Sequence, residues 1–344
     1  MPRQSANLLR NALKYLLALG VAAGLLWFVY KDIDFEEDII GRLNQINYFW
    51  VGLSVGFSLI AFYLRAVRWN LLLQPLGFSP PAGHTFLALM VGYVSNIFVP
   101  RVGEVTRCAA LRSTDNVPLS SSFGTVVAER VIDLVVLIGI VVAGLFLEFD
   151  KLKSFLQSYF QGQQEGYERM VGIAILAALA GTVLMITALT ILRIFRHRLR
   201  RSPLLQKLKA FFLALAEGFL SLRRIKHPGA FWWSTAAIWL LYFAMAYAMF
   251  FAIPATSGLS LMAGFLVLIM GGLGMSAPVQ GGFGTYHAFV SSALLLYGVA
   301  ELDGKFFAFI IHTSQIITVL VFGGLSAAIV PFIQPTPKEL TPGR

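Results

Sequence analysis

The 344-residue sequence is poor in charged residues and has a single cysteine. Only 13% of its residues are Asp, Glu, Lys or Arg, against about 25% in a soluble domain. Hydrophobic residues make up 57% of the chain. The lone Cys108 excludes an internal disulfide and any zinc site built from several cysteines. This composition predicts an all-α polytopic membrane protein.

Three motifs of catalysis or nucleotide use are also missing: a Walker A loop, a His-x-x-x-His metal pair and a serine nucleophile elbow. We therefore expect no catalytic residue, no metal ion, no cofactor, and transport that is downhill or ion-coupled. The net charge of +10 does not indicate nucleic-acid binding, because the basic residues flank apolar stretches as the positive-inside rule predicts.

Apolar stretches long enough to cross a bilayer predict six full transmembrane helices within a single domain, residues 1–333. The first follows Lys14 and reads as an uncleaved signal anchor, since it lacks a small-x-small cleavage site. A polar tail follows at residues 334–344. The six expected spans are Leu13–Tyr30, Tyr48–Leu64, Phe123–Leu147, Met170–Leu192, Phe231–Ile253 and Phe306–Ile333.

Loop charges predict the orientation in the cell membrane. Basic residues before the first span place the N-terminus in the cytoplasm, and the acidic loop 32–38 is expected outside. Arg65 and Arg68, just after the second expected span, read as cytoplasmic loop charges. The basic segment 193–229 is expected in the cytoplasm, with an amphipathic helix at Leu204–Leu222 lying in the interface, and the C-terminus lies on the same side.

Two Pro-x-x-Gly turns interrupt long apolar stretches, at Pro100–Gly103 and at Pro278–Gly281. Broken backbone at membrane depth is tolerated only where it is buried in protein or lines a wet cavity. The loop charges predict that Thr85–Leu111 and Leu259–Tyr297 are re-entrant hairpins entering from opposite faces. Together with the flanking spans they predict an inverted repeat of about residues 48–147 and 231–333. The alternative is a pair of kinked full spans.

The first turn and the following span carry charges where charge is expensive. If the span begins near Leu119, Glu129 lies roughly 15 Å inside it, where a charge costs about 2.5–3.5 kcal/mol. Glu129 and Asp133 share a helix face, and Arg130 is spaced to pair with Asp133. The first turn adds further charged residues at Arg101, Glu104, Arg107 and Arg112.

The slight surplus of arginine suits an anionic phosphate headgroup, because the planar guanidinium makes bidentate bonds to phosphate. We expect Arg101, Arg107 and Arg130 to hold the headgroup and the carboxylates of Glu104, Glu129 and Asp133 to orient them. The alternative, which is compatible with binding, is a structural network of ion pairs that fixes the re-entrant loop.

The second turn is neutral and rich in glycine. Gly281, Gly282 and Gly284 allow a close approach of backbone to a ligand. A helix that begins near Gly284 would direct free N–H groups toward an anion. His287 and His312 read as packing residues rather than as ligands.

The sequence Val99-Pro100-Arg101-Val102-Gly103-Glu104, with Arg107, Glu129-Arg130 and Asp133, resembles the lysylphosphatidylglycerol synthase transmembrane region. This family is also described as flippase-like or UPF0104-type. Pro278-x-x-Gly281-Gly282-x-Gly284 and Arg65-Ala66-x-Arg68-Trp69 extend the resemblance, which covers about residues 13–331.

In bifunctional members of that family, the membrane region is implicated in moving aminoacylated phosphatidylglycerol, and a separate cytosolic domain attaches the amino acid. We expect this chain to resemble the flippase part alone. The resemblance does not give the substrate; together with the surplus of arginine, it leads us to expect a translocase for an anionic or polyprenyl-phosphate-linked lipid. The alternatives are an integral membrane transferase with a lipid-linked donor, or a non-transporting partner of a lipid-modifying enzyme.

Overall fold

The computed structural model describes residues 20–99, 101–148, 224–277 and 279–333. These residues form helices and turns, with no strand in the described ranges. The expected span at 170–192, the amphipathic segment at 204–222, the polar tail, Pro100 and Pro278 lie outside them. Of the first expected span, residues 20–30 are described and form the helix Gly20–Tyr30.

Four described helices are long and apolar enough to cross a membrane. They coincide with the four spans expected in these ranges, so that part of the prediction is confirmed. A helix of about 20 apolar residues is long enough to cross the hydrocarbon core of a bilayer. The four are α2 (Tyr48–Leu73), α5 (Leu119–Leu147), α9 (Pro228–Phe250) and α12 (Glu301–Ile329).

The expected end of the second span at Leu64 is wrong, because α2 continues to Leu73. Nothing in the stretch Arg65–Leu73 breaks a helix, and the first proline after it is Pro75, just beyond the helix end. Arg65 and Arg68 are therefore helix residues with buried side chains and not loop charges.

Each Pro-x-x-Gly turn lies between two shorter helices. The first joins α3 (Ala82–Phe98) to α4 (Gly103–Asp115), and the second joins α10 (Leu261–Ser276) to α11 (Thr285–Leu295). Both halves of the chain therefore have the order long, short, short, long. The inverted repeat itself stays a prediction.

Glycines let the two arms of the first hairpin touch. A Cβ on Gly92 would lie 2.7 Å from the carbonyl oxygen of Gly103, and one on Gly103 would overlap Gly92 and Asn96. The Asn96 side chain accepts a hydrogen bond of 2.7 Å from the Gly103 amide. This bond satisfies one of the free N–H groups at the start of α4.

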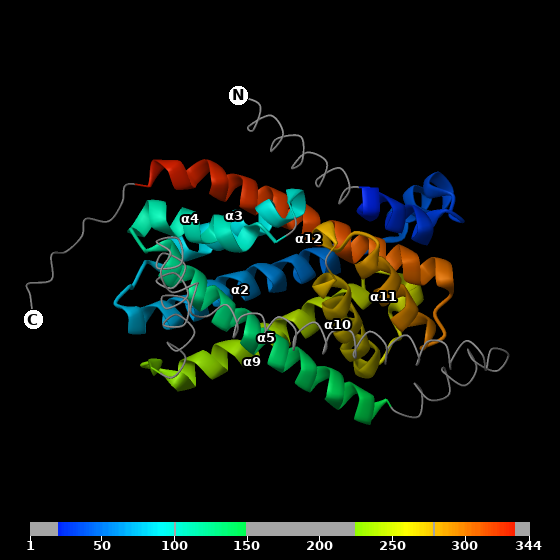
Figure 1. Cartoon of the computed structure of the whole chain (residues 1–344). Helices are drawn as coiled ribbons and strands as arrows, with labels where there is room; N and C mark the ends of the chain where they lie inside the picture. Colours follow the sequence, from blue (N-terminus) through cyan, green and yellow to red (C-terminus); the bar gives the residue numbers. More distant parts are fainter. Residues whose placement is uncertain (1–19, 100, 149–223, 278, 334–344) are drawn as a thin grey trace, which may run out of the picture.

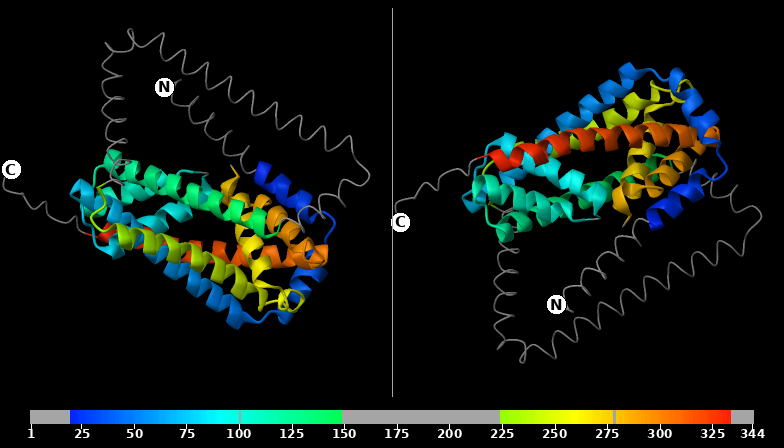
Figure 2. Two further views of the ribbon diagram at one scale, coloured as in Figure 1. Left: turned by 90° about the horizontal axis from the view of Figure 1, so that it is seen from below. Right: turned by 90° about the horizontal axis from the view of Figure 1, so that it is seen from above.

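The helices that open the two halves, α2 and α9, are antiparallel neighbours. Three hydrogen bonds join them: the Asn47 amide donates to the Ala252 carbonyl at 2.9 Å, the Ser54 hydroxyl to the Met245 carbonyl, and the Arg68 side chain to the Thr235 hydroxyl. The partner's residue number falls as the first number rises, as in an antiparallel pair. The hairpins lie at opposite ends of the long helices, α3–α4 at one end and α10–α11 at the other (Figures 1 and 2).

Each hairpin packs against a long helix of the other half. Gly323 of α12 receives Val94 of α3, and a Cβ there would lie 2.6 Å from the Val94 Cβ. Gly272 of α10 lies against Leu137 of α5 in the same way. The two turns also meet, because the Gln280 side chain donates hydrogen bonds of 2.8 Å to the carbonyls of Ile97 and Phe98.

We predict that Gly103→Ala lowers the free energy of unfolding by about 1–3 kcal/mol, since the added methyl group is forced into a packed contact. Denaturant unfolding of the purified chain in detergent measures this change. Gly83→Ala on the same hairpin is the matched control, because a Cβ there meets nothing within 4 Å. Equal stability of the two variants would contradict the close packing of α3 and α4.

Candidate functional site

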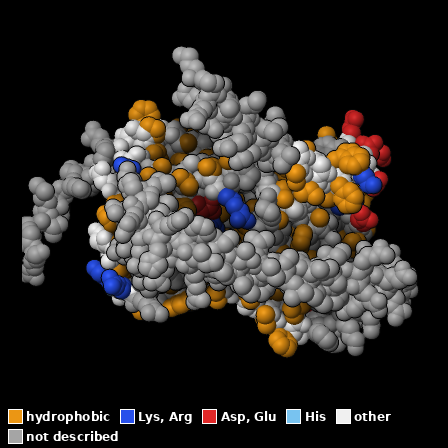
Figure 3. All heavy atoms as spheres, in the orientation of Figure 1, with side chains coloured by type: hydrophobic (Ala, Val, Ile, Leu, Met, Phe, Trp, Pro, Cys, Tyr) orange, Lys and Arg blue, Asp and Glu red, His pale blue; other side chains and the backbone are white. Residues whose placement is uncertain are grey.

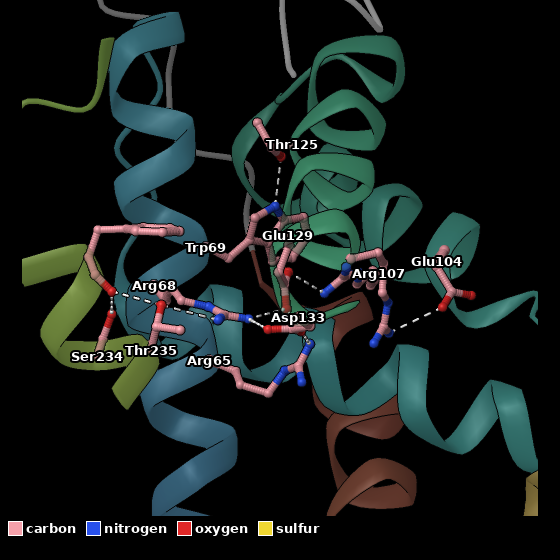
Figure 4. A network of polar contacts seen from close by, with 12 residues as sticks. Arg65, Arg68, Trp69, Glu104, Arg107, Thr125, Glu129, Asp133, Ser234 and Thr235 are labelled. Carbon is pink, nitrogen blue, oxygen red and sulfur yellow. Dashed lines mark hydrogen bonds and ion pairs between the residues drawn. The ribbon is translucent and has the colours of Figure 1, made fainter. Parts of the chain in front are cut away.

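Two acidic residues of α5 face two basic residues of α2. Glu129 and Asp133 are one helical turn apart, and so are Arg65 and Arg68. Asp133 accepts from Arg65 at 3.0 Å and from Arg68 at 2.7 Å. Glu129 accepts from Arg65 and, at 3.3 Å, from Arg68. The two helices are therefore joined by four charge-assisted contacts (Figure 4).

A third arginine reaches Glu129 from the first hairpin. Arg107 of α4 donates from Nη1 to Oε2 of Glu129 at 3.1 Å. Glu129 is fully buried, and Arg107 is 2% exposed. One carboxylate near the middle of α5 thus holds arginines from two other elements, α2 and α4.

Neighbouring side chains fix these arginines in place. Arg65 donates to the Tyr242 hydroxyl at 3.1 Å and Arg68 to the Thr235 hydroxyl at 3.3 Å, both on α9. The guanidinium of Arg107 lies 4.7 Å from the Trp69 ring centre. Such cation–π contacts strengthen when desolvated.

The buried cluster, defined as Arg65, Arg68, Arg107, Glu129 and Asp133, contains three positive and two negative side chains. It therefore carries a net charge of +1 in a site with little access to water. Unbalanced charge in such a place is costly, so an anion would be favoured there.

One edge of Arg107 has no partner. Its Nε and Nη2 atoms are buried and lack a hydrogen bond to any described residue. These two atoms point along the same edge of the planar guanidinium, which is the edge that grips two oxygens of a carboxylate or phosphate. Arg65 and Arg68 use Nη2 on that edge for the carboxylates of α5.

The expected pairing of Arg130 with Asp133 is wrong. Arg130 pairs with Glu104 of α4 at 3.2 Å, and the Asp133 carboxylate is taken by the arginines of α2. Arg130 follows Glu129 by one residue, so its side chain leaves α5 on a different side of the helix. It lies outside the buried cluster and is 41% exposed. Basic and acidic side chains surface together near the middle of one face of the molecule, with hydrophobic side chains around them (Figure 3).

The remaining residues expected at the first turn lie apart from the buried cluster. Arg101 is exposed, has a left-handed backbone with φ of 61°, and makes no ion pair with another described residue. Gly103 lies at the close contact between α3 and α4, where a Cβ would overlap Gly92 and Asn96. Arg112 is exposed in the last turn of α4.

The glycines of the second turn contact protein in this structure. Gly281, Gly282 and Gly284 all have positive φ, which explains their residue type. A Cβ on Gly284 would overlap Leu25 of the helix Gly20–Tyr30. α11 begins at Thr285, as expected. Its anion-binding role stays a prediction.

Arg65, Arg68 and Gln280 are the residues that sequence reasoning did not assign to the site. Two arginines spaced i, i+3 and two carboxylates spaced i, i+4 on another apolar helix form complementary faces, and this signal points to their pairing. Within the described ranges, no group of three or more His, Cys, Asp or Glu residues is arranged to hold a metal ion.

The sequence matches a known protein family. Residues 15–323 match the family described as the lysylphosphatidylglycerol synthase TM region. The chain belongs to this family. It is a multi-pass membrane protein, as the sequence predicts.

Two curated relatives match parts of this family member. A segment of 133 residues, 38% of the chain, is 29% identical to glycosyltransferase AglD of Haloferax volcanii and covers 21% of that protein. A segment of 100 residues, 28% of the chain, is 29% identical to a UPF0104 membrane protein of Methanocaldococcus jannaschii and covers 30% of it. The matches thus span less than a third of either relative. No solved structure matches the chain.

We predict that Glu129→Gln destabilises the protein by about 3–5 kcal/mol, because it leaves three buried arginines against one carboxylate. Denaturant unfolding in detergent measures the loss. Glu301→Gln is the control, since the Glu301 side chain is 66% exposed and, among the described residues, forms an ion pair only with Lys305 one turn away. If both variants unfold at the same denaturant concentration, Glu129 does not organise the cluster.

Proposed function

We propose that this protein is a lipid translocase that moves an anionic or polyprenyl-phosphate-linked lipid across the cell membrane. The observation that carries the proposal is the free edge of Arg107 beside a buried cluster of net charge +1. A phosphate headgroup supplies two acceptor oxygens and the missing negative charge. Family membership supports a lipid-related role.

In this proposal Glu129 and Asp133 orient the arginines. Both oxygens of each carboxylate are occupied by arginine, so neither is available as a base or a ligand. Glu129 holds Nη1 of Arg107 and leaves the Nε and Nη2 edge for the headgroup. Arg130 and Arg101 lie closer to the surface and receive the headgroup first.

Access to Arg107 requires movement, because its free edge is buried in this conformation. The Arg130–Glu104 pair is more exposed than the cluster behind it, with side chains 41% and 22% exposed. In the first step, a headgroup phosphate replaces the Glu104 carboxylate at Arg130, since both are anions that accept hydrogen bonds through oxygen. Rocking of the two halves would then expose the site alternately to either side.

The glycine-rich turn would complete the site from the opposite hairpin. Gln280 ties this turn to the end of α3, just before the first turn. Movement of one hairpin is therefore passed directly to the other. We propose that the N- and C-termini are cytoplasmic and that Pro100 and Pro278, which lie outside the described residues, belong to the substrate site.

A second candidate is a membrane transferase that uses a lipid-linked donor. Its support is Glu104, whose Oε2 atom has no partner among the described residues and could act as a general base. The partial similarity to a protein named as a glycosyltransferase fits this candidate. Incubation of proteoliposomes with a labelled lipid-linked sugar separates the two, because a chemically modified product indicates the transferase and unmodified, relocated lipid indicates the translocase.

We predict that Arg107→Gln lowers the transport rate of fluorescent phosphatidylglycerol in proteoliposomes at least tenfold. The loss of bidentate, charge-assisted bonds to phosphate is the reason. The transport rate of Arg107→Lys should lie between that of Arg107→Gln and that of the original protein, since lysine keeps the positive charge but lacks the planar guanidinium that binds two oxygens.

Arg112→Gln is the matched control for this experiment. It removes a positive charge from the same helix at an exposed position outside the cluster. Transport that falls equally in Arg107→Gln and Arg112→Gln would reflect net charge alone and would contradict the site.

A further inference from the structure

A cleft of about 320 Å³ lies between the helix Gly20–Tyr30, α11 and α12. This volume is within the range of small-ligand pockets. Its walls are mostly apolar or aromatic, and they are formed by Leu26, Trp27, Tyr30, Phe283 and Phe309. The arginine cluster contributes no residue to it.

Two histidines lie at the buried side of this cleft. His287 of α11 and His312 of α12 are each 2% exposed, and their ring centres are 4.7 Å apart with the rings nearly perpendicular. Histidines with such burial normally use both ring nitrogens in hydrogen bonds.

Each histidine uses one nitrogen to hold the glycine-rich turn. Nδ1 of His287 accepts from the Gly284 amide at 3.3 Å, so its hydrogen must be on Nε2. Nε2 of His312 lies 2.9 Å from the Gly281 carbonyl, which only accepts, so Nε2 carries the hydrogen. A neutral imidazole has one N–H, so Nδ1 of His312 is an acceptor.

The other two nitrogens have no partner among the described residues. Nε2 of His287 is a donor, and Nδ1 of His312 is an acceptor. A hydroxyl group satisfies both, because its oxygen accepts from one histidine while its hydrogen is donated to the other. An ionised carboxylate or phosphate offers acceptors only and would leave Nδ1 of His312 facing a negative oxygen.

We propose that this cleft binds a neutral lipid through a hydroxyl group, with the apolar chain against the aromatic walls. Lys31 is the charged residue of the lining and is exposed, with its ammonium group 5.6 Å from the Phe28 ring centre. The deep end of the cleft therefore carries no charged side chain among its lining residues. This site is separate from the phosphate site and does not depend on the proposed translocase function.

Photolabelling of the full chain in nanodiscs tests the proposal. The probe is a hexadecanol that carries a diazirine and an alkyne on its chain, and the comparison compound is its methyl ether. The ether lacks the hydroxyl hydrogen and leaves Nδ1 of His312 unpaired. We expect the ether to label peptides of α11 and α12 about tenfold less, which corresponds to about 1.4 kcal/mol.

Two tryptophan variants of one helix locate the bound chain. Leu26→Trp fills the cleft and should lower labelling by the alcohol about tenfold. Phe28→Trp is the control, because Phe28 is 65% exposed and does not line the cleft. Neither variant alters the histidines.

Equal labelling by alcohol and ether would overturn recognition of the hydroxyl group. Equal labelling of Leu26→Trp and Phe28→Trp would overturn the cleft as the binding site. Arg107→Gln should keep full labelling even where it abolishes transport, so the two proposals fail independently. A loss of labelling in Arg107→Gln would place the alcohol at the arginine cluster and contradict the proposal.

Discussion

The structure depends on one carboxylate, that of Glu129, buried near the middle of α5. Three arginines from α2 and α4 donate hydrogen bonds to it. The Glu129 side chain is fully buried, so water cannot take the place of these arginines. A buried charge of this kind is tolerated only when it is paired and hydrogen-bonded. The position of α5 therefore fixes where α2 and the first hairpin must lie. The same contact leaves one edge of Arg107 open, so the element that organises the fold also forms the proposed binding site.

The two halves contact each other through their hairpins, each of which packs against a long helix of the other half. α3 packs against α12, and α10 packs against α5, in each case through a glycine that allows close approach. Gln280 then connects the second turn to the end of the first. The glycine-rich turn therefore contacts the hairpin that supplies Arg107 to the cluster. His287 and His312 hydrogen-bond to glycines of that same turn, so the residues that line the apolar cleft contact the turn that Gln280 joins to the end of α3.

The sequence predicted the four long helices of the described ranges, except for the end of α2, but it paired Arg130 with the wrong carboxylate. The span expected at Phe123–Leu147 is α5, which begins four residues earlier, at Leu119, the start that the depth of Glu129 had assumed. The breaks after Phe98 and Ser276 follow from proline and glycine. Pairing between helices was harder, because Arg65 and Arg68 lie more than 60 positions from their acidic partners. Their charge suggested a loop, and only the packing of α2 against α5 makes them buried ligands of Glu129.

A structure of the full chain with a short-chain phosphatidylglycerol is the most direct test of the account. The account predicts phosphate oxygens within hydrogen-bonding distance of Nε and Nη2 of Arg107, while Glu129 still accepts from Nη1 of the same residue. A phosphate bound elsewhere, with the Arg107 edge closed by protein or water, would contradict it.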